Sequence, residues 1–307
     1  MRLSIIIPTK DRGQIFHETL GNAVEATLHL DAEIIVVNDS KTSDLIVPSN
    51  FSSVIVLQNT KTGVASARNT GARKATGSIL LFLDDDILIN RTSVDQVIRL
   101  HEALPFSCFN PDWTYPPSLA SELMKTSFGR FMKHKGLDHF KGWYNDTSWV
   151  DGNLFPSKSV ASFHLSINRV DFERTGGYNE AFPFAGFEDH DFPQRLREVG
   201  IATYIDARVT VFHNEKDKLK VGNWLAAQER RAVTRRVAAE QGHAEVMLRY
   251  PWWKIVLFAA IRPFSAFDVK ILGLIPNKKS MDAIYEFMIG VFLASRIHRG
   301  YTTVYAT

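Results

Sequence analysis

The stretch Ile79-Leu-Leu-Phe-Leu-Asp-Asp-Asp86 decides how the chain folds, because five apolar residues run directly into three carboxylates. A continuous apolar run of this length predicts a strand that helices cover on both faces. Adjacent carboxylates repel one another unless a cation or hydrogen bonds compensate them, and their oxygens suit Mg²⁺ or Mn²⁺. The stretch therefore predicts a metal site that handles phosphate groups at a strand end. A solvated turn or the acidic start of a helix is the alternative.

Similar apolar runs precede this one at residues 3–7, 34–37 and 54–57, and segments of helical composition lie between most of them. This alternation predicts a parallel α/β sheet, in which ligands bind at the carboxyl ends of the strands. Polar residues follow the first two runs, as Pro8-Thr-Lys-Asp-Arg12 and Asn38-Asp-Ser40. After the third run, residues 63–75 predict a helix of small residues that packs closely on the sheet.

Residues 105–160 differ in composition, because Pro, Gly, Trp and Tyr are frequent and periodicity is poor. Long irregular segments are usually functional or disordered, and this aromatic content argues against disorder. We interpret the segment as the acceptor side of a site; packing of an irregular subdomain is the alternative. Regular structure is predicted again as a strand at 161–168, a helix beginning at 187–192, short strands at 201–205 and 209–213, and helices from 221 onward.

Composition indicates a globular protein with a substantial core, since 45% of the 307 residues are hydrophobic. The formal charge of +3 is uneven: residues 215–307 carry 15 Lys/Arg against 8 Asp/Glu, and the first 214 residues carry 21 against 25. The single cysteine, Cys108, excludes an intramolecular disulfide and any multi-cysteine metal site. We expect neither a secretion signal nor a conventional membrane-spanning helix. Tryptophans beside basic residues after 250 favour helices on an anionic membrane surface, and a packed helical layer or homodimer interface is the alternative.

Six segments resemble, in the same order, the motifs of family 2 glycosyltransferases with the GT-A fold: residues 4–12, 33–40, 63–74, 83–86, 176–180 and 188–191. The resemblance covers roughly residues 3–214. It implies an α/β fold with a Rossmann-like, mostly parallel sheet flanked by helices, and the helical pattern from residue 221 onward predicts a C-terminal helical extension. It also implies a catalytic domain at 1–214, with a nucleotide-binding half at 1–104 and an acceptor-binding half at 105–214. Residues 215–307 would form the helical region that meets a membrane or a second copy.

The resemblance assigns a donor site to the strand exits and to the helix after residue 63. The residues implied in nucleotide binding are Pro8, Thr9, Asp11, Arg12, Asp39, Arg68, Asp84 and Asp85. The aspartate triplet resembles the family's DXD motif, which implies that Asp86, with Asp84 and the strand-end His213, holds Mn²⁺ or Mg²⁺. For Arg68, pairing with a nearby carboxylate is the alternative.

Residues 188–191 resemble the acidic acceptor motif of the family, which implies that Asp189 is the general base and Glu188 the second candidate. Acceptor binding is assigned to Asp191, Gly177 and Trp149. The family inverts the anomeric centre in a single displacement, so the resemblance implies no covalent intermediate. Acidic residues at a helix start are otherwise partners of the helix dipole.

Together these features predict a metal-dependent inverting glycosyltransferase that moves a sugar from a nucleoside-diphosphate sugar, with a UDP-sugar favoured, to a glycan or lipid-linked acceptor. We expect a cytoplasmic protein, and the membrane hypothesis would place it at the inner face of the plasma membrane. We expect no nucleic-acid partner. An inactive nucleotide-binding or scaffold relative is the alternative. A sugar-nucleotide pyrophosphorylase is less favoured, because only Gly13 follows the first strand exit, and a dehydrogenase lacks its G-x-G-x-x-G motif.

Overall fold

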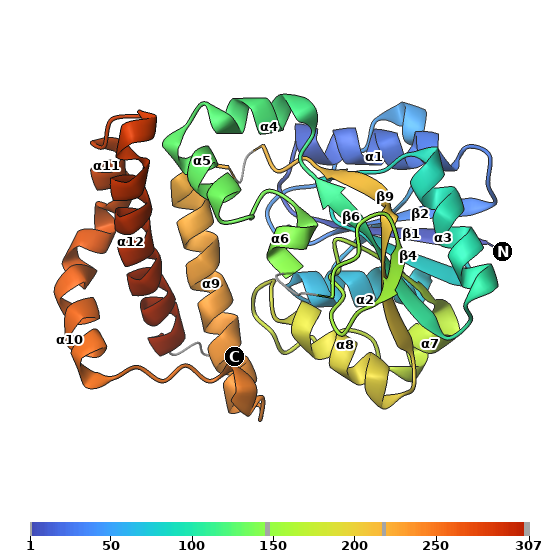
Figure 1. Cartoon of the computed structure of the whole chain (residues 1–307). Helices are drawn as coiled ribbons and strands as arrows, with labels where there is room; N and C mark the ends of the chain where they lie inside the picture. The colour runs from blue at the N-terminus through green and yellow to red at the C-terminus, as the bar shows by residue number, and fades with distance from the viewer. Residues whose placement is uncertain (1, 145–147, 217–218, 304–307) are drawn as a thin grey trace. The chain divides into compact units, whose positions relative to one another are not determined.

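The computed structural model describes residues 2–144, 148–216 and 219–303 and divides the chain into two compact units (Figure 1). Unit 1 consists of residues 1–116, 139–181 and 188–214. Unit 2 consists of residues 117–138, 182–187 and 215–307. Unit 2 thus joins the C-terminal helices to two segments that the sequence analysis placed in the acceptor half.

Unit 1 is built on one nine-stranded sheet with the strand order β3-β2-β1-β4-β8-β6-β9-β5, and β7 pairs with β9. The strands are β1 Leu3–Thr9, β2 Ala32–Asn38, β3 Ile55–Gln58, β4 Ile79–Leu83, β5 Ile87–Leu88, β6 Ser107–Thr114, β7 Leu154–Pro156, β8 His164–Asn168 and β9 Ala202–His213. The first four strands are parallel to one another, and beyond β4 the pairing is mixed. Every residue of β1 and β4 is buried, as continuous apolar runs predict.

The helices of unit 1 cover this sheet, with α1 above it and α2 below it in the view of Figure 1. They are α1 Gln14–Thr27, α2 Val64–Lys74, α3 Arg91–Ala103, α6 Phe140–Tyr144, α7 Arg169–Arg174 and α8 Glu188–Glu198, with a 3₁₀ turn at η1 Ser49–Phe51. A Cβ on Gly71 would lie 2.4 Å from Cγ2 of Ile6. The small residues of α2 therefore bring it as close to the sheet as the sequence predicts.

The structure has one long strand, β9, where the sequence predicts two short strands. β9 is continuous through Asp206, which faces Pro111 of β6 and Leu154 of β7. Its pairing with β6 is nevertheless interrupted, because Asp206 faces Pro111 and Thr210 faces the next residue, Asp112, so residues 207–209 form a bulge on β9 at the gap between the two predicted strands. The strand therefore carries His213 to the edge of the sheet where β5 begins.

Unit 2 is helical. Its elements are α4 Pro117–Met124, α5 Ser127–His134, α9 Val221–Glu240, η2 Ala244–Val246, α10 Trp252–Ile261, η3 Arg262–Ala266, α11 Asp268–Gly273, η4 Lys279–Met281 and α12 Asp282–Thr302. Helices α9 and α12 pack closely, since a Cβ on Gly300 would lie 2.2 Å from the carbonyl oxygen of Glu229. The Glu229 carboxylate also pairs with Arg296 at 3.0 Å. Within the described ranges, none of the helices has the length and hydropathy that crossing a membrane requires.

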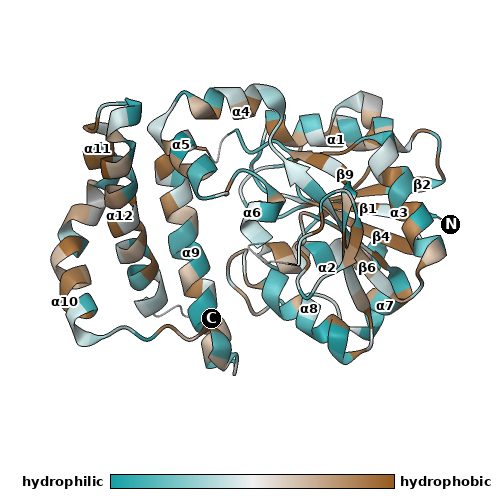
Figure 2. Cartoon of the chain, in the orientation of Figure 1, coloured by the Kyte–Doolittle hydropathy of each residue, from teal (hydrophilic) through white to brown (hydrophobic). Residues whose placement is uncertain are grey.

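The two units distribute hydropathy differently (Figure 2). In unit 1 the most hydrophobic segments are the central strands β1 and β4, which are buried. In unit 2 helix α10 is also strongly hydrophobic, but only one of its ten residues, Phe258, is buried.

Candidate active site

The candidate site lies at the carboxyl ends of β1, β2 and β4, which end at the same edge of the sheet because they are parallel. Each strand delivers polar residues there: Thr9 ends β1, Asp39 follows β2, and the triplet that begins at Asp84 follows β4. Asp11, in the loop after β1, has a φ of 54°. A left-handed backbone is strained for a residue with a side chain, and such strain is concentrated at functional sites.

Two arginines compensate the charges of the aspartate triplet. Nη2 of Arg12 lies 2.6 Å from Oδ2 of Asp86, and its Nε lies 3.3 Å from Oδ1 of Asp85. Thr9 donates a hydrogen bond of 2.7 Å to Asp85. Nη2 of Arg68 lies 2.7 Å from Oδ1 of Asp84. The triplet is therefore not a solvated turn but a set of paired carboxylates.

His213 lies beside Asp86, with 3.2 Å between its Nε2 and Oδ1 of the aspartate, and both side chains are buried. The backbone fixes this approach, because the amide of Asn214 donates to the carbonyl of Asp86 at 2.6 Å. The indole of Trp113 packs edge-on against the imidazole, with 4.8 Å between ring centroids. The structure thus brings together two of the three predicted metal ligands.

Glu215, which sequence reasoning missed, completes a group of metal-ligating side chains. Asp86, His213 and Glu215 each offer one ligand atom, and these three atoms lie within 4.8 Å of one another. Two carboxylates and an imidazole suit Mn²⁺, and the carboxylates also suit Mg²⁺. The residues present therefore fit a divalent cation. The only signal in the sequence was the position of Glu215 two residues after His213.

Arg68 connects the aspartate triplet to the acidic start of α8. Its Nη1 lies 3.2 Å from Oε1 of Glu188, and both side chains are buried. The pairing that the sequence analysis held as the alternative for Arg68 is therefore present, with Asp84 as a second partner. The guanidinium of Arg68 thus pairs with one carboxylate of the aspartate triplet and with one at the start of α8, which brings the two segments together in unit 1.

Asp189 has a different environment from Glu188. Its Oδ1 accepts hydrogen bonds from the amide and the hydroxyl of Ser162, at 2.7 and 2.6 Å. Burial and the neighbouring charge of Glu188 raise the pKa of Asp189 to about 7. A carboxylate with such a pKa can exchange a proton near neutral pH. Ser162 was not among the predicted residues, because only the folded chain brings it to α8.

Asp39 and Asp11, both predicted to contact the nucleotide, are held by other parts of unit 1. Asp39 accepts hydrogen bonds of 2.6 Å from the side chain of Asn59 and 3.0 Å from the amide of Gly63. Asp11 accepts one of 2.5 Å from the hydroxyl of Ser43. The exit of β2 is therefore joined to the start of α2, and the exit of β1 to the loop after β2.

The residues assigned to acceptor binding have identifiable packing partners. Asp191 pairs with Arg195 at 2.7 Å. Gly177 has a φ of 76°, and a Cβ there would lie 2.7 Å from Oδ1 of Asn69, so this turn requires glycine. Trp149 packs in an aromatic cluster that includes Phe140 and donates a hydrogen bond of 2.8 Å to Asp151. Their roles toward an acceptor stay predictions.

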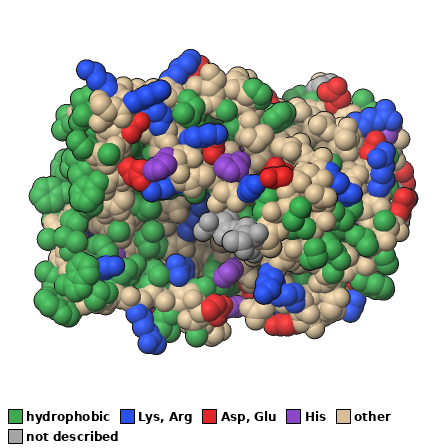
Figure 3. Space-filling view, in the orientation of Figure 1, with side chains coloured by type: hydrophobic (Ala, Val, Ile, Leu, Met, Phe, Trp, Pro, Cys, Tyr) green, Lys and Arg blue, Asp and Glu red, His purple; other side chains and the backbone are tan. Residues whose placement is uncertain are grey.

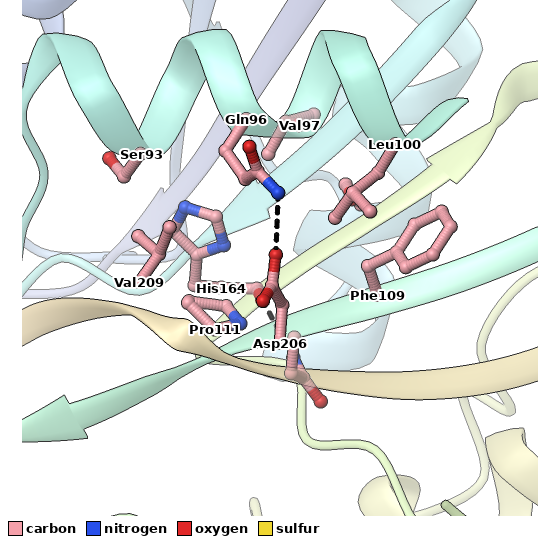
Figure 4. Close-up of a pocket in the computed structure, with 11 residues that line it drawn as sticks. Ser93, Gln96, Val97, Leu100, Phe109, Pro111, His164, Asp206 and Val209 are labelled. Carbon is pink, nitrogen blue, oxygen red and sulfur yellow. Dashed lines mark hydrogen bonds between the residues drawn. The ribbon is translucent and has the colours of Figure 1, made fainter. Parts of the chain in front are cut away.

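A separate small cavity lies between α3 and the strands β6, β8 and β9 (Figure 4). Gln96 donates a hydrogen bond of 2.8 Å to Asp206, which also pairs with Arg208. Burial lowers the pKa of His164 to about 4, so its ring is neutral at physiological pH. The lining offers no group of acidic residues comparable to the triplet, and we assign no substrate to this cavity.

Two stretches of the chain, which contain the residues of the site, match models of known families. Residues 4–160, a little over half of the chain, match the model described as glycosyl transferase family 2. The chain belongs to this family. Residues 154–215, which contain Asp189 and His213, match a second model, described as the N-terminal domain of galactosyltransferase.

Two relatives of this family 2 chain illustrate its similarity in sequence. The validoxylamine A glucosyltransferase of Streptomyces hygroscopicus subsp. jinggangensis is 27% identical over 228 residues, which cover 65% of this chain and 52% of the relative. An uncharacterized glycosyltransferase of Haemophilus influenzae is 33% identical over 197 residues, covering 63% of this chain and 61% of the relative. The chain thus spans less than two thirds of the length of these curated relatives.

Solved structures support the GT-A fold of this family 2 chain. A mannosyltransferase of Pyrobaculum calidifontis in complex with GDP-Man and Mn²⁺ superposes with a TM-score of 0.55 at 18% identity, covering 97% of this chain and 86% of that one. GalNAc-T7 with UDP, GalNAc and Mn²⁺ gives a TM-score of 0.55 at 14% identity, covering 80% and 52%. The predicted α/β fold with a C-terminal helical region is therefore confirmed.

Proposed function

We propose that this protein transfers a sugar from a nucleoside-diphosphate sugar to an acceptor hydroxyl, with a divalent cation and with inversion. One observation supports this most directly: Arg68 contacts Asp84 of the triplet and Glu188 at the start of α8. Catalysis requires the donor and acceptor groups to be positioned together, and this guanidinium joins the segments proposed for each.

Asp86 and His213, with Glu215, would hold Mn²⁺ or Mg²⁺ beside the donor. A bound cation would stabilise the negative charge that develops on the leaving diphosphate. Asp84 pairs with Arg68 whereas Asp86 pairs with Arg12, and we propose that Asp84 contributes to nucleotide binding and not only to pairing with Arg68. Thr9, Asp11, Arg12 and Asp39 surround the same strand exits and are proposed to contact the base and ribose.

In the acceptor half, we propose Asp189 as the general base. It removes the proton from the acceptor hydroxyl while that oxygen attacks the anomeric carbon, and the bond from this carbon to the diphosphate oxygen breaks. The nucleoside diphosphate leaves with the bonding electrons, and the proton stays on Asp189 until it passes to solvent. Asp189 is favoured over Glu188 because Glu188 pairs with a buried guanidinium, whereas the partners of Asp189 are the neutral groups of Ser162.

The nucleotide, the sugar and the acceptor are separate proposals. A UDP-sugar donor and a glycan or lipid-linked acceptor on the cytoplasmic side stay our predictions. The two solved structures were determined with GDP-Man and with UDP and GalNAc, so GDP-Man is the alternative donor to test beside UDP-sugars.

The test is to incubate the full chain with UDP-sugars and GDP-Man, with Mn²⁺ or with EDTA, and to measure release of the nucleoside diphosphate. We expect one donor to be consumed in Mn²⁺ and not in EDTA. Pyrophosphate-dependent formation of a nucleoside triphosphate would indicate a pyrophosphorylase. No consumption of any donor, together with no nucleotide binding, would indicate an inactive scaffold.

A further inference from the structure

Large apolar side chains are exposed together on unit 2. Helices α10 and α11 and the turn η3 pack along α12, and Figure 3 shows hydrophobic side chains covering a continuous part of this side of the molecule. We call this surface the apolar face. Its members that are more than half exposed include Trp252, Trp253, Val256, Phe264, Leu274 and Phe287. Exposed apolar patches of this extent indicate an interaction site.

In the part of the chain that the structure describes, helix α10 is mostly exposed. Its sequence, Trp252-Trp-Lys-Ile-Val-Leu-Phe-Ala-Ala-Ile261, is apolar except for Lys254, and a helix this hydrophobic is normally buried. Only Phe258 is buried, against the rings of Tyr250 and His298. Most of the other apolar side chains of α10 are therefore left exposed by the described residues.

Positive charges border the apolar face. The ammonium of Lys254 lies 5.3 Å from the ring of Trp253, and that of Lys270 lies 5.8 Å from the ring of Phe267. Arg249 and Lys278 are exposed nearby in the sequence. Aromatic rings beside lysines are typical of helices that lie in the interface of a membrane.

The acidic residues of the same helices are used in ion pairs inside unit 2. Asp268 pairs with Arg296 at 2.8 Å, Asp282 with Arg130 at 2.7 Å, and Glu286 with Lys135. In the described residues, no acidic side chain forms an ion pair with Lys254 or Lys270. The border of the apolar face is therefore positive, which complements an anionic surface.

We propose that the apolar face inserts into the interface of a bilayer that contains anionic lipids. Ten residues of α helix span about 15 Å, half of a hydrocarbon core of about 30 Å, so α10 would lie in the plane of the membrane. A second copy fits less well, because a two-fold pair would bring the same positive borders together. This inference concerns unit 2 alone and holds whether or not the proposed transfer takes place.

The test uses the full chain without substrates. Flotation is measured with vesicles of phosphatidylcholine alone and of phosphatidylcholine mixed with phosphatidylglycerol. We expect binding to the mixed vesicles, weaker binding at high salt, and little binding to phosphatidylcholine alone. Equal binding to the two kinds of vesicle, or to neither, would overturn the proposal.

Two pairs of variants locate the binding surface. Trp252→Ser with Trp253→Ser should weaken binding at least about tenfold, because two interfacial indoles are lost. The matched control is Leu28→Ser with Val170→Ser, which removes equally exposed apolar side chains from unit 1 and should leave binding unchanged. Lys254→Glu with Lys270→Glu should also weaken binding, and the control Lys74→Glu with Lys158→Glu should not.

Unchanged flotation of the tryptophan variant would overturn the assignment of the apolar face. Sedimentation equilibrium of the lipid-free chain provides the other decisive result. A wild-type dimer that the tryptophan substitutions convert to a monomer, with no flotation of either, would show that a second copy covers this surface and would overturn the membrane proposal.

Discussion

The strand-exit edge of unit 1 and the apolar face of unit 2 depart from the usual distribution of side chains in opposite ways. At the strand exits, Arg68, Asp86 and Glu188 are charged and buried. On the apolar face, Trp252 and Phe287 are large, apolar and exposed. Charged side chains are rarely fully buried unless paired, and large apolar patches are rarely exposed.

Buried charges and exposed apolar side chains each need a partner that offsets their cost in free energy. The buried charges are paired within unit 1, so the fold already supplies their partners. The apolar face is exposed in the described part of unit 2, and we propose that its partner comes from outside the unit. Substitutions should therefore affect chemistry and stability at the first region, and association at the second.

The largest effect is expected for Asp86→Asn, which removes a proposed cation ligand. Stabilisation of a leaving group by a cation is worth several kcal/mol, so transfer should fall by about 10⁴-fold. The rate is measured in Mn²⁺ with the donor that the screen identifies. The control is Asp206→Asn, another buried aspartate of unit 1, which should retain activity. A rate for Asp86→Asn within about tenfold of wild type would contradict the metal assignment.

Asp189→Asn should lower turnover by about a thousandfold while donor affinity stays unchanged, because only deprotonation of the acceptor is lost. In the wild type, the raised pKa means that Asp189 is protonated and inactive as a base at low pH. The rate should therefore rise as pH increases through about 7. A pH–rate profile for both proteins tests this, and an identical rising limb in the variant would exclude Asp189 as the base.

Arg68→Met should lower the free energy of unfolding by about 3 kcal/mol, because Glu188 is left buried without its cation. The comparison is Arg73→Met, whose exposed guanidinium lies 3.8 Å from Glu180 and should contribute less than about 0.5 kcal/mol. Urea unfolding measures both. Similar losses of unfolding free energy in the two variants would mean that burial of the Arg68 pair contributes nothing to stability.

The smallest effect is expected for Trp252→Ser on the apolar face. Because this side chain is 77% exposed, the free energy of unfolding should change by no more than about 0.5 kcal/mol. Trp113→Ala, at a fully buried position of unit 1, should cost about 3–5 kcal/mol. A comparable loss for Trp252→Ser would show that α10 is covered by the protein and would remove the contrast between the two regions.

Much of the fold of unit 1 could be predicted, because buried parallel strands are continuous apolar runs. The run that ends at Leu83 was predicted with its observed bounds, and the helix after Gly63 began at the next residue. The joining of 117–138 to the C-terminal helices could not be predicted. It depends on contacts such as that between Arg130 and Asp282, which are 152 residues apart.

The residue types of the site were also predictable, but their contacts were not. The aspartate motif indicated Asp86 and a strand-end position indicated His213, and the structure places the two side by side. The ion pairs of Arg12 with the triplet and of Arg68 with Glu188 join residues 74 and 120 positions apart. Such pairs leave no periodicity in the sequence, and for the same reason Ser162 was missed.

Asp86 and its neighbours are proposed to hold a cation that would stabilise the diphosphate of the donor. Thermal unfolding of the full chain with UDP or GDP, in Mn²⁺ and in EDTA, tests it for the wild type and Asp86→Asn. We expect one nucleotide to raise the melting temperature of the wild type only in Mn²⁺. The same nucleotide should not raise the melting temperature of the variant. Equal stabilisation in EDTA, or equal stabilisation of both proteins, would contradict it.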